Sequence, residues 1–370
     1  MIPFANPKRS YECLADEIHK AIQLVLTSGY WIQGQWTKAF AEAFAAYNGV
    51  DFCIPVANGT DALELALRAL EIGPGDQVIT VANAGGYSTT ACRLVGATPV
   101  YVDNNPASML MDIPDAVRAC GSGVKAIIVT HLYGRMVDVA RLIAALADRN
   151  LKVALIEDCA QAHGASLNGL KAGAIGDIGT FSFYPTKNLG AVGDAGALIT
   201  KDPELSKKIQ HLQQYGWEER FHSVTPHGRN SRMDEIQAAV LSIKLPFLDG
   251  WNRTRRQIVA EYKKCAPDFV RFFSSGDADS VDHLCVIEVE NRDEIRNELA
   301  LQGVGTAIHY PVLDFQQKSQ LGLPQVIHNA KVAETINPNI LTLPCFPEMT
   351  NDEIQTVCKA LRNLTSTQRR

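Results

Sequence analysis

The 370-residue chain lacks several features that would place it in common protein classes. None of its nine cysteines stands in a C-x-x-C pair, so we expect neither a disulfide framework nor a structural zinc site. Basic side chains do not outnumber acidic ones (35 against 40), which argues against nucleic acid as a partner. No apolar run approaches the ~18 residues of a membrane span, and the segment MIPFANPKRS is not a signal peptide. We therefore expect a cytoplasmic protein without a membrane partner.

Two catalytic signatures are also missing. The absence of G-x-S-x-G and of a G-x-G-x-x-G after the first expected strand disfavours a serine hydrolase and a dinucleotide-binding dehydrogenase. Segment 164–171 has the glycines and the lysine of a phosphate-binding loop, but it lacks the adjacent Gly-Lys-Ser/Thr and the following helix. Cys159 and His163 could be metal ligands, but a third ligand is missing, so we expect no metal site.

What is present is the pattern of an α/β enzyme. Helical spacing over residues 10–48 is followed by short apolar strands that alternate with helices as far as residue 156. This alternation predicts a mostly parallel sheet with helices on both faces. A polar segment, 218–231, and a helix at 233–245 come next. We expect a large domain, 1–245, and a smaller α+β domain, 246–370, with strands at 282–289 and 305–309.

Three groups then stand out as a possible site. Lys187 lies where an apolar, β-prone run gives way to a glycine-rich loop, and a lysine in such surroundings tends to lose its proton and become a nucleophile. Asp158 ends a strand, where the pleat favours it over Glu157 for reaching the rim of the sheet. The turn at 58–61 opens a helix with Thr60 as the expected N-cap, and such a helix start suits a phosphate.

Each group also has a simpler interpretation. Asp158 could be a salt-bridged or capping carboxylate, and most strand–glycine–helix junctions bind nothing. However, the carboxyl ends of parallel strands form one rim, which would bring all three groups together. An amine, a carboxylate and a phosphate site are what pyridoxal phosphate requires.

The chain as a whole resembles the DegT/DnrJ/EryC1/StrS family of sugar aminotransferases, whose fold is the fold type I (aspartate aminotransferase-like) scaffold. The resemblance extends from about residue 10 to residue 362 and rests on colinear motifs. These motifs are NGTDALELAL (58–67), GPGDQVIT (73–80), EDCAQAHGA (157–165), FSFYPTKNLGAVGDAGA (181–197), GRNSRMDEIQAAVL (228–241), IHYP (308–311) and LPCFPEMT (343–350).

The resemblance implies a role for each matching residue around the cofactor. Lys187 would form the Schiff base with pyridoxal phosphate and then move protons, and Asp158 would keep the ring nitrogen protonated. The remaining cofactor contacts would be Gln161 at the ring hydroxyl or face, Tyr87 stacked on the ring, and Gly59, Thr60 and Ser182 at the phosphate. The segment VANAGG before Tyr87 lacks a proline that relatives often have there.

Outside the cofactor site, the resemblance implies contacts to a second subunit and to the substrate. Asn230 would reach the phosphate of the neighbouring subunit, which implies a homodimer with shared active sites. His309 and Tyr310 would lie near the sugar-nucleotide pocket, although a strand end packed on the small domain is the alternative.

The implied reaction is amino transfer from L-glutamate to a nucleotide-linked keto sugar, with pyridoxamine phosphate formed during turnover. Sugar-dehydrating relatives carry histidine in place of Lys187. The segment KNLGAVGD resembles the corresponding segment of enzymes that act on 3-keto sugars more than that of enzymes that act on 4-keto sugars. We therefore expect a dTDP-linked 3-keto-6-deoxyhexose as substrate. A 4-keto sugar aminotransferase, a sugar dehydratase and a non-catalytic relative on the same scaffold are the alternatives.

Overall fold

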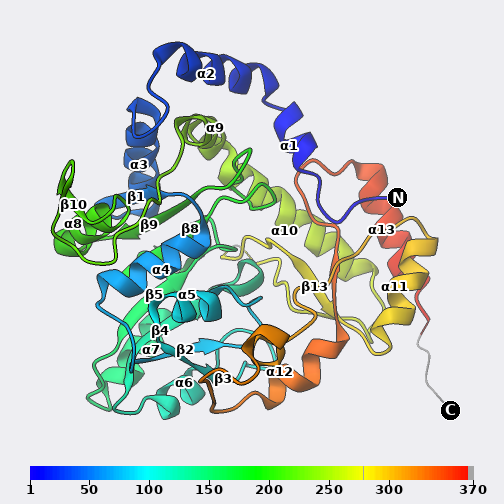
Figure 1. The fold of residues 1–370 in the computed structure, drawn as a ribbon. Helices are drawn as coiled ribbons and strands as arrows, with labels where there is room; N and C mark the ends of the chain where they lie inside the picture. The colour runs from blue at the N-terminus through cyan, green and yellow to red at the C-terminus, as the bar shows by residue number, and fades with distance from the viewer. Residues whose placement is uncertain (278, 366–370) are drawn as a thin grey trace.

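The computed structural model describes residues 1–277 and 279–365, and its centre is an eight-stranded sheet (Figure 1). The strand order is β1-β9-β8-β5-β4-β2-β3-β14. Strand β9 is antiparallel to both of its neighbours, and the other pairings are parallel. The strands are β1 (Phe52–Val56), β2 (Gln77–Val81), β3 (Thr98–Val102), β4 (Val124–Thr130), β5 (Ala154–Asp158), β8 (Ile178–Ser182), β9 (Gly196–Thr200) and β14 (Val326–Ile327). The predicted α/β fold with a mostly parallel sheet is confirmed.

The central strands are apolar on both faces because helices cover both. In β4, Ala126 and Ile128 enter one core while Ile127 and Val129 enter another, as the two-residue period of a strand requires. The first core includes α4, α5 and α8, and the second includes α6 and α7 (Figure 1). These helices are α4 (Gly59–Ala69), α5 (Tyr87–Val95), α6 (Ile113–Ala119), α7 (Val139–Ala147) and α8 (Pro203–Leu212).

The helical spacing expected over residues 10–48 is confirmed by three helices within residues 7–48, two of which pack against the helix that follows the polar segment. They form α1 (Pro7–Glu12), α2 (Ala15–Ser28) and α3 (Gln35–Asn48), and both α2 and α3 contact α9 (Glu235–Lys244). The polar segment itself contains a hairpin of β10 (Trp217–Glu219) and β11 (His222–Ser223). A second hairpin joins β6 (Ser166–Leu167) to β7 (Leu170–Lys171).

The C-terminal part has a smaller sheet and its own apolar core. Strands β12 (Arg271–Phe272), β13 (Cys285–Glu288) and β15 (Ile340–Leu343) pair antiparallel, and α10 (Leu248–Cys265), α11 (Arg292–Leu301) and α13 (Asn351–Arg362) pack around them. The strand predicted at 305–309 is wrong, because only Ala307 makes a single bridge, to Thr342. The remaining helices are α12 (Lys331–Ile336), η1 (Leu132–Gly134), η2 (Leu245–Phe247), η3 (Asp314–Gln316), η4 (Lys318–Gln320) and η5 (Asn337–Asn339).

The predicted domain boundary at Pro246 falls in the turn between α9 and α10. Chain from the far N-terminus also joins the C-terminal core, since Ile2 is buried there and bridges Val304. The division into two domains stays a prediction. Within the described residues, no helix combines the length and the apolar character needed to cross a bilayer.

Candidate active site

A cavity of about 580 Å³ opens at the carboxyl ends of β5 and β8. Every predicted site residue except Asn230 lines it. These residues are Gly59, Thr60, Tyr87, Asp158, Gln161, Ser182, Lys187, His309 and Tyr310. The three candidate groups thus lie in one cavity at the carboxyl ends of the strands, as expected for a parallel sheet.

Lys187 lies in the loop after β8, in a turn closed by its own backbone N–H, which donates to Tyr184 O at 2.8 Å. Burial lowers the pKa of its amine to about 8, although the negative charge of Asp158 opposes this shift. The turn is tight, since a Cβ on Gly190 would lie 2.5 Å from Pro185 O. At pH values near 8, the buried amine is thus neutral in a large fraction of molecules, as a nucleophile or general base must be.

The residue after Lys187 fixes the loop to the rest of the molecule. The buried side chain of Asn188 donates to Asn252 Oδ1 (2.8 Å) and to Val281 O (3.0 Å). Its Oδ1 contacts Nδ1 of His283 at 2.8 Å, and because an amide oxygen only accepts, that ring nitrogen carries the proton. Burial keeps the pKa of His283 well below its usual value, so the ring is neutral.

Asp158 and Glu157 point to opposite sides of β5, as the pleat predicted. Asp158 lines the cavity, accepts from Ala160 N at 3.1 Å and contacts Thr130 Oγ1 at 3.4 Å. Burial raises its pKa, although Ala160 N–H and Lys187 favour the charged form. A cationic ring nitrogen in the cavity would supply the opposite charge that this carboxylate needs.

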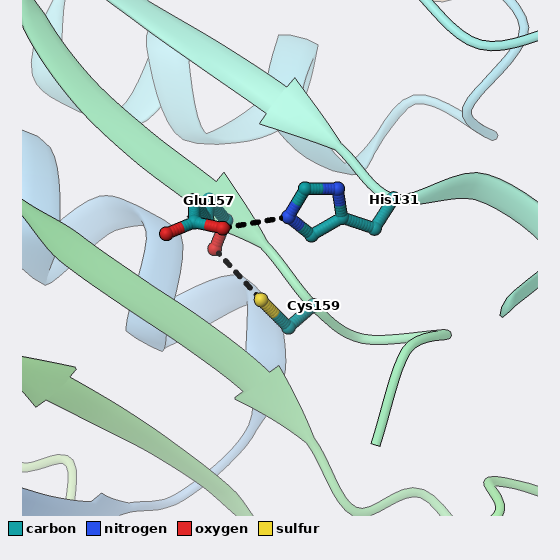
Figure 2. Close-up of side chains that lie close together, drawn as sticks. All are labelled: His131, Glu157 and Cys159. Atoms are coloured by element: carbon teal, nitrogen blue, oxygen red, sulfur yellow. Dashed lines mark hydrogen bonds and ion pairs between the residues drawn. The ribbon is translucent and has the colours of Figure 1, made fainter. Parts of the chain in front are cut away.

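Glu157 faces away, into a buried cluster with His131 and Cys159 (Figure 2). Its carboxylate accepts from the backbone N–H groups of residues 173, 175 and 176, at 2.7 to 3.0 Å. His131 Nδ1 accepts from Val137 N, so its Nε2 carries the proton and donates to Glu157 at 2.8 Å. Burial opposes ionisation of Glu157, but these donors hold its pKa below the usual value.

This cluster has the residue types of a metal site but not its chemistry. The three potential ligand atoms lie within 4.8 Å of one another. However, His131 and Glu157 already use their ligand atoms in hydrogen bonds, and Cys159 Sγ donates to Glu157 O at 3.6 Å. Burial also raises the pKa of Cys159 well above the thiol's usual value, which keeps the sulfur protonated. The cluster therefore braces the end of β5 behind Asp158.

The N-terminus of α4 forms one wall of the cavity at Gly59 and Thr60. The helix cap predicted at Thr60 is wrong, because Asn58 is the N-cap and its side chain accepts from Asp61 N at 2.8 Å. Asn58 precedes the first helical residue, and a capping side chain must reach N2 or N3 from there. A Cβ on Gly59 would lie only 2.6 Å from Cβ of Ser182, so glycine is what lets the helix start approach β8. The result is a cradle of backbone N–H groups beside a serine hydroxyl, which suits a phosphate.

Aromatic and amide groups line the opposite wall. Gln161 donates to Tyr310 Oη at 3.1 Å and accepts from Tyr133 N at 2.7 Å. Tyr133 Oη donates in turn to His309 O at 2.9 Å. The ring of Tyr87 is half exposed and meets that of Tyr310 edge to face, with centroids 6.1 Å apart. Gln161, Tyr310 and Tyr87 thus form one connected wall.

Asn230 is the one predicted site residue that lies away from this cavity. It is exposed, bridges Gln214 in the backbone, and accepts from Arg232 Nε at 2.9 Å. Its predicted reach into a neighbouring subunit stays a prediction.

Sequence reasoning missed Tyr133, Arg255 and His283. Arg255 and His283 line the cavity, and Tyr133 supports it through Gln161 and His309. Tyr133 could have been found, since it follows a buried strand within the polar sequence THLYG. Arg255 gave no local signal, because it lies on α10 among other charged residues.

The residues of the cavity fit a cofactor with three features. Its aldehyde would meet Lys187, its basic ring nitrogen would meet Asp158, and its phosphate would meet Gly59, Thr60 and Ser182. The cradle that a Cβ on Gly59 would fill supports this fit.

Comparisons with known proteins agree with this arrangement. A model of the DegT/DnrJ/EryC1/StrS aminotransferase family matches residues 12–362. The dTDP-3-amino-3,4,6-trideoxy-alpha-D-glucose transaminase of Streptomyces venezuelae is 38% identical over 98% of this chain and 95% of its own length. The dTDP-3-amino-3,6-dideoxy-alpha-D-galactopyranose transaminase of Aneurinibacillus thermoaerophilus is 40% identical over 98% and 99%. The UDP-N-acetyl-3-dehydro-alpha-D-glucosamine 3-aminotransferase of Acidithiobacillus ferrooxidans is 38% identical over 98% and 97%.

Solved structures are similar over the same extent. S. venezuelae DesV, solved in complex with a ketimine intermediate, superposes with a TM-score of 0.92 at 37% identity and covers 98% of this chain and 97% of its own. NtdA from Bacillus subtilis, solved with bound pyridoxamine phosphate, gives 0.88 at 30% identity over 97% of this chain and 84% of its own.

Proposed function

The chain belongs to the DegT/DnrJ/EryC1/StrS aminotransferase family, and from this premise we propose that it transfers the amino group of L-glutamate to a dTDP-linked 3-keto-6-deoxyhexose. The protein is an aminotransferase of fold type I, and its cofactor is pyridoxal 5'-phosphate, which becomes pyridoxamine 5'-phosphate during turnover. The observation that carries the proposal is the meeting of Lys187, Asp158 and the N-terminus of α4 in one cavity.

The relatives and one sequence motif support the proposed keto position and nucleotide. The names of these three relatives all specify an amino group at carbon 3 of a nucleotide-linked sugar, and two of the names specify a dTDP sugar. The segment KNLGAVGD also favours a 3-keto substrate over a 4-keto one. A 4-keto sugar is the second candidate on the same scaffold.

When bound, the cofactor supplies a carbonyl carbon that accepts the amino group and a ring that stores the electrons released with a proton. The residues of the chain supply the rest. Lys187, whose pKa burial lowers to about 8, would take the proton from the α-carbon of the amino donor and return it to the carbonyl carbon of the cofactor. Asp158 would keep a proton on the ring nitrogen by charge attraction. The N–H groups of Gly59 and Thr60, with Ser182, would hold the phosphate.

The other wall would orient the substrates. The hydrogen bond between Gln161 and Tyr310 fixes two side chains that face the cofactor space, and Tyr87 can cover the ring. We place His309 and Tyr310 at the sugar nucleotide. We further propose that two chains form a homodimer, in which Asn230 of each completes the phosphate site of the other.

An absorbance experiment tests the reaction class. Purified protein with pyridoxal phosphate should lose its aldehyde-form band and gain the amine-form band when L-glutamate is added. A keto-sugar nucleotide should then reverse the change. A spectrum that stays constant with L-glutamate would contradict the proposal.

Mass spectrometry of the products separates the candidates. A panel of dTDP- and UDP-linked 3-keto and 4-keto sugars should give the aminated product from the dTDP-linked 3-keto-6-deoxyhexose at the highest kcat/KM. A dehydrated sugar without nitrogen would instead identify a dehydratase.

A further inference from the structure

Arg255 is a buried cation on the cavity wall that the proposed mechanism does not use. It lies on α10, is only 6% exposed, and lines the cavity together with Lys187 and His283. Figure 1 shows α10 crossing the molecule between the large sheet and the C-terminal helices α11 and α13.

The charge of Arg255 has no carboxylate partner in the described part of the chain. Its Nη1 donates to two carbonyl oxygens, those of Cys345 and His283, and its buried Nε has no hydrogen-bond partner there. Asp282 and Glu348 act on it only from beyond the 4.0 Å of an ion pair. A buried cation without an opposite charge is unfavourable, and an anionic ligand in the cavity would correct this.

The hydrogen bonds of Asn188 join the loop of Lys187 to the part of α10 that carries Arg255. Asn188, the residue after Lys187, donates to Asn252, and Asn252 lies one helical turn before Arg255 on the same face of α10. Asn188 also binds the ring of His283, whose carbonyl oxygen accepts from Arg255. The loop that carries Lys187 and the helix that carries Arg255 are thus joined through Asn188.

We propose that Arg255 binds the α-carboxylate of the amino donor, an inference that rests on the aminotransferase function proposed above. The donor's amine must come to the position of Lys187, and the α-carboxylate is attached to the same carbon as that amine. An anion site that lines the same cavity as Lys187 therefore suits this carboxylate. The diphosphate of a sugar nucleotide is separated from carbon 3 by the sugar ring and would lie further out. A guanidinium matches the two oxygens of a carboxylate with two parallel hydrogen bonds.

The test compares three amino donors that differ in their carboxylates. L-Glutamate has both carboxylates, L-2-aminobutyrate lacks the γ-carboxylate, and 4-aminobutyrate lacks the α-carboxylate. The conversion of the cofactor band is measured against donor concentration for the wild type, Arg255→Gln and Arg255→Lys. Arg256→Gln is the matched control, since Arg256 is on the same helix, donates to Ser280 O at 2.9 Å and does not line the cavity.

We expect Arg255→Gln to raise the half-saturating concentrations of L-glutamate and L-2-aminobutyrate by about 10- to 100-fold. The same variant should change that of 4-aminobutyrate by less than about 3-fold, and Arg256→Gln should change none of them. Arg255→Lys should recover part of the loss, because it keeps the charge but not the fork. Glutarate, which cannot react with the cofactor, should bind the wild type more tightly than Arg255→Gln in calorimetry.

The outcomes separate this inference from the proposed function. If the wild type does not react with L-glutamate, the proposed function fails. If it reacts and Arg255→Gln saturates with L-glutamate as the wild type does, the role of Arg255 is wrong. Weaker binding of dTDP or UDP with unchanged L-glutamate saturation would assign Arg255 to the diphosphate and overturn the inference. Should Arg255→Gln fail to fold, as judged by circular dichroism, Arg255→Lys decides by the same measurements.

Discussion

Lys187 is surrounded by groups that set when its amine is neutral. Burial lowers the pKa of the amine to about 8, and the charge of Asp158 raises it against that trend. Below this pKa the amine is protonated and cannot attack an aldehyde. We therefore expect uptake of pyridoxal phosphate by cofactor-free protein to accelerate as the pH rises and to level off above about 8.

Asp158→Asn supplies the control for this pH profile. Removing the negative charge takes away the group that favours protonated Lys187, so the midpoint should move to lower pH. A pH midpoint above 10 in the wild type would contradict the effect of burial on Lys187. A midpoint that moves to higher pH in Asp158→Asn would contradict the effect of the Asp158 charge.

Replacing Lys187 by alanine removes the proposed proton carrier. Turnover should fall by more than about 10²-fold, because general acid–base catalysis contributes at least that much. Noncovalent binding of the cofactor should remain, since Asp158 and the α4 cradle are untouched, and equilibrium dialysis would measure it. Activity retained in Lys187→Ala would refute the assignment.

Asn188 supports Lys187 through buried hydrogen bonds. Asn188→Ala leaves the acceptors Asn252 Oδ1 and Val281 O without their donor, which should lower the free energy of unfolding by about 1–3 kcal/mol. Urea titration measures this loss, and a change below about 0.5 kcal/mol would mean that the amide is dispensable.

Among single residues, the sequence predicted the groups proposed for catalysis better than the other residues that line the cavity. Lys187 and Asp158 could be found because each lies where an apolar run ends, and the strand pleat favours Asp158 over Glu157 for the rim. Arg255 could not, because its place depends on which distant segments meet. Arg255 lies on the cavity only because α10 packs against the loop after Lys187.

Among the elements, the start of α4 depends on close packing against β8. A Cβ on Gly59 would meet Ser182 at 2.6 Å, so Gly59→Ala should push the helix start outward and weaken cofactor binding. We expect the dissociation constant for pyridoxal phosphate to rise by about 5- to 150-fold, the equivalent of about 1–3 kcal/mol of overpacking.

Gly250→Ala is the matched control for Gly59→Ala. Gly250 lies within α10, and no atom is within 4 Å of the position of an added Cβ. That variant should keep its cofactor affinity and gain about 0.5–1 kcal/mol of stability from helix propensity. Equal cofactor affinity in the two variants would contradict the packing argument for Gly59.

Element types were readable from the sequence where a period was repeated. Strands β1, β2 and β3 are among the short apolar strands expected before residue 156, because buried parallel strands give continuous apolar runs. The strand expected at 305–309 failed, since its residues serve the cavity and make one bridge only. The cap expected at Thr60 failed by two residues, because both Asn58 and Thr60 can cap and only the backbone decides.

For the whole molecule, the open question is the partner of Asn230. If active sites are shared in a homodimer, two inactive variants should complement each other. A mixed dimer of Lys187→Ala and Asn230→Ala has one site with both changes and one site with neither. Random mixing should therefore restore about a quarter of the wild-type activity, measured after co-refolding.

Lys187→Ala mixed with Asp158→Asn is the control, because both changes lie in the same chain's cavity. Under shared sites this pair should give no recovery. Recovery in the control pair, or none in the Asn230 pair, would show that Asn230 does not cross between subunits.

Strand β9 is antiparallel to both of its neighbours and lies between β1 and β8 in the sheet, although it follows both of them in the chain. A ribosome therefore releases β1 and α4 long before β9 exists to hold them in the sheet. A Cβ on Gly196 of β9 would lie 2.4 Å from the carbonyl carbon of Asn58, so the N-cap of α4 packs directly against this strand, which is synthesised later. We expect nascent chains that stop short of Thr200 to be unable to bind the cofactor. Added cofactor should therefore affect folding only after the first half of the chain has been synthesised.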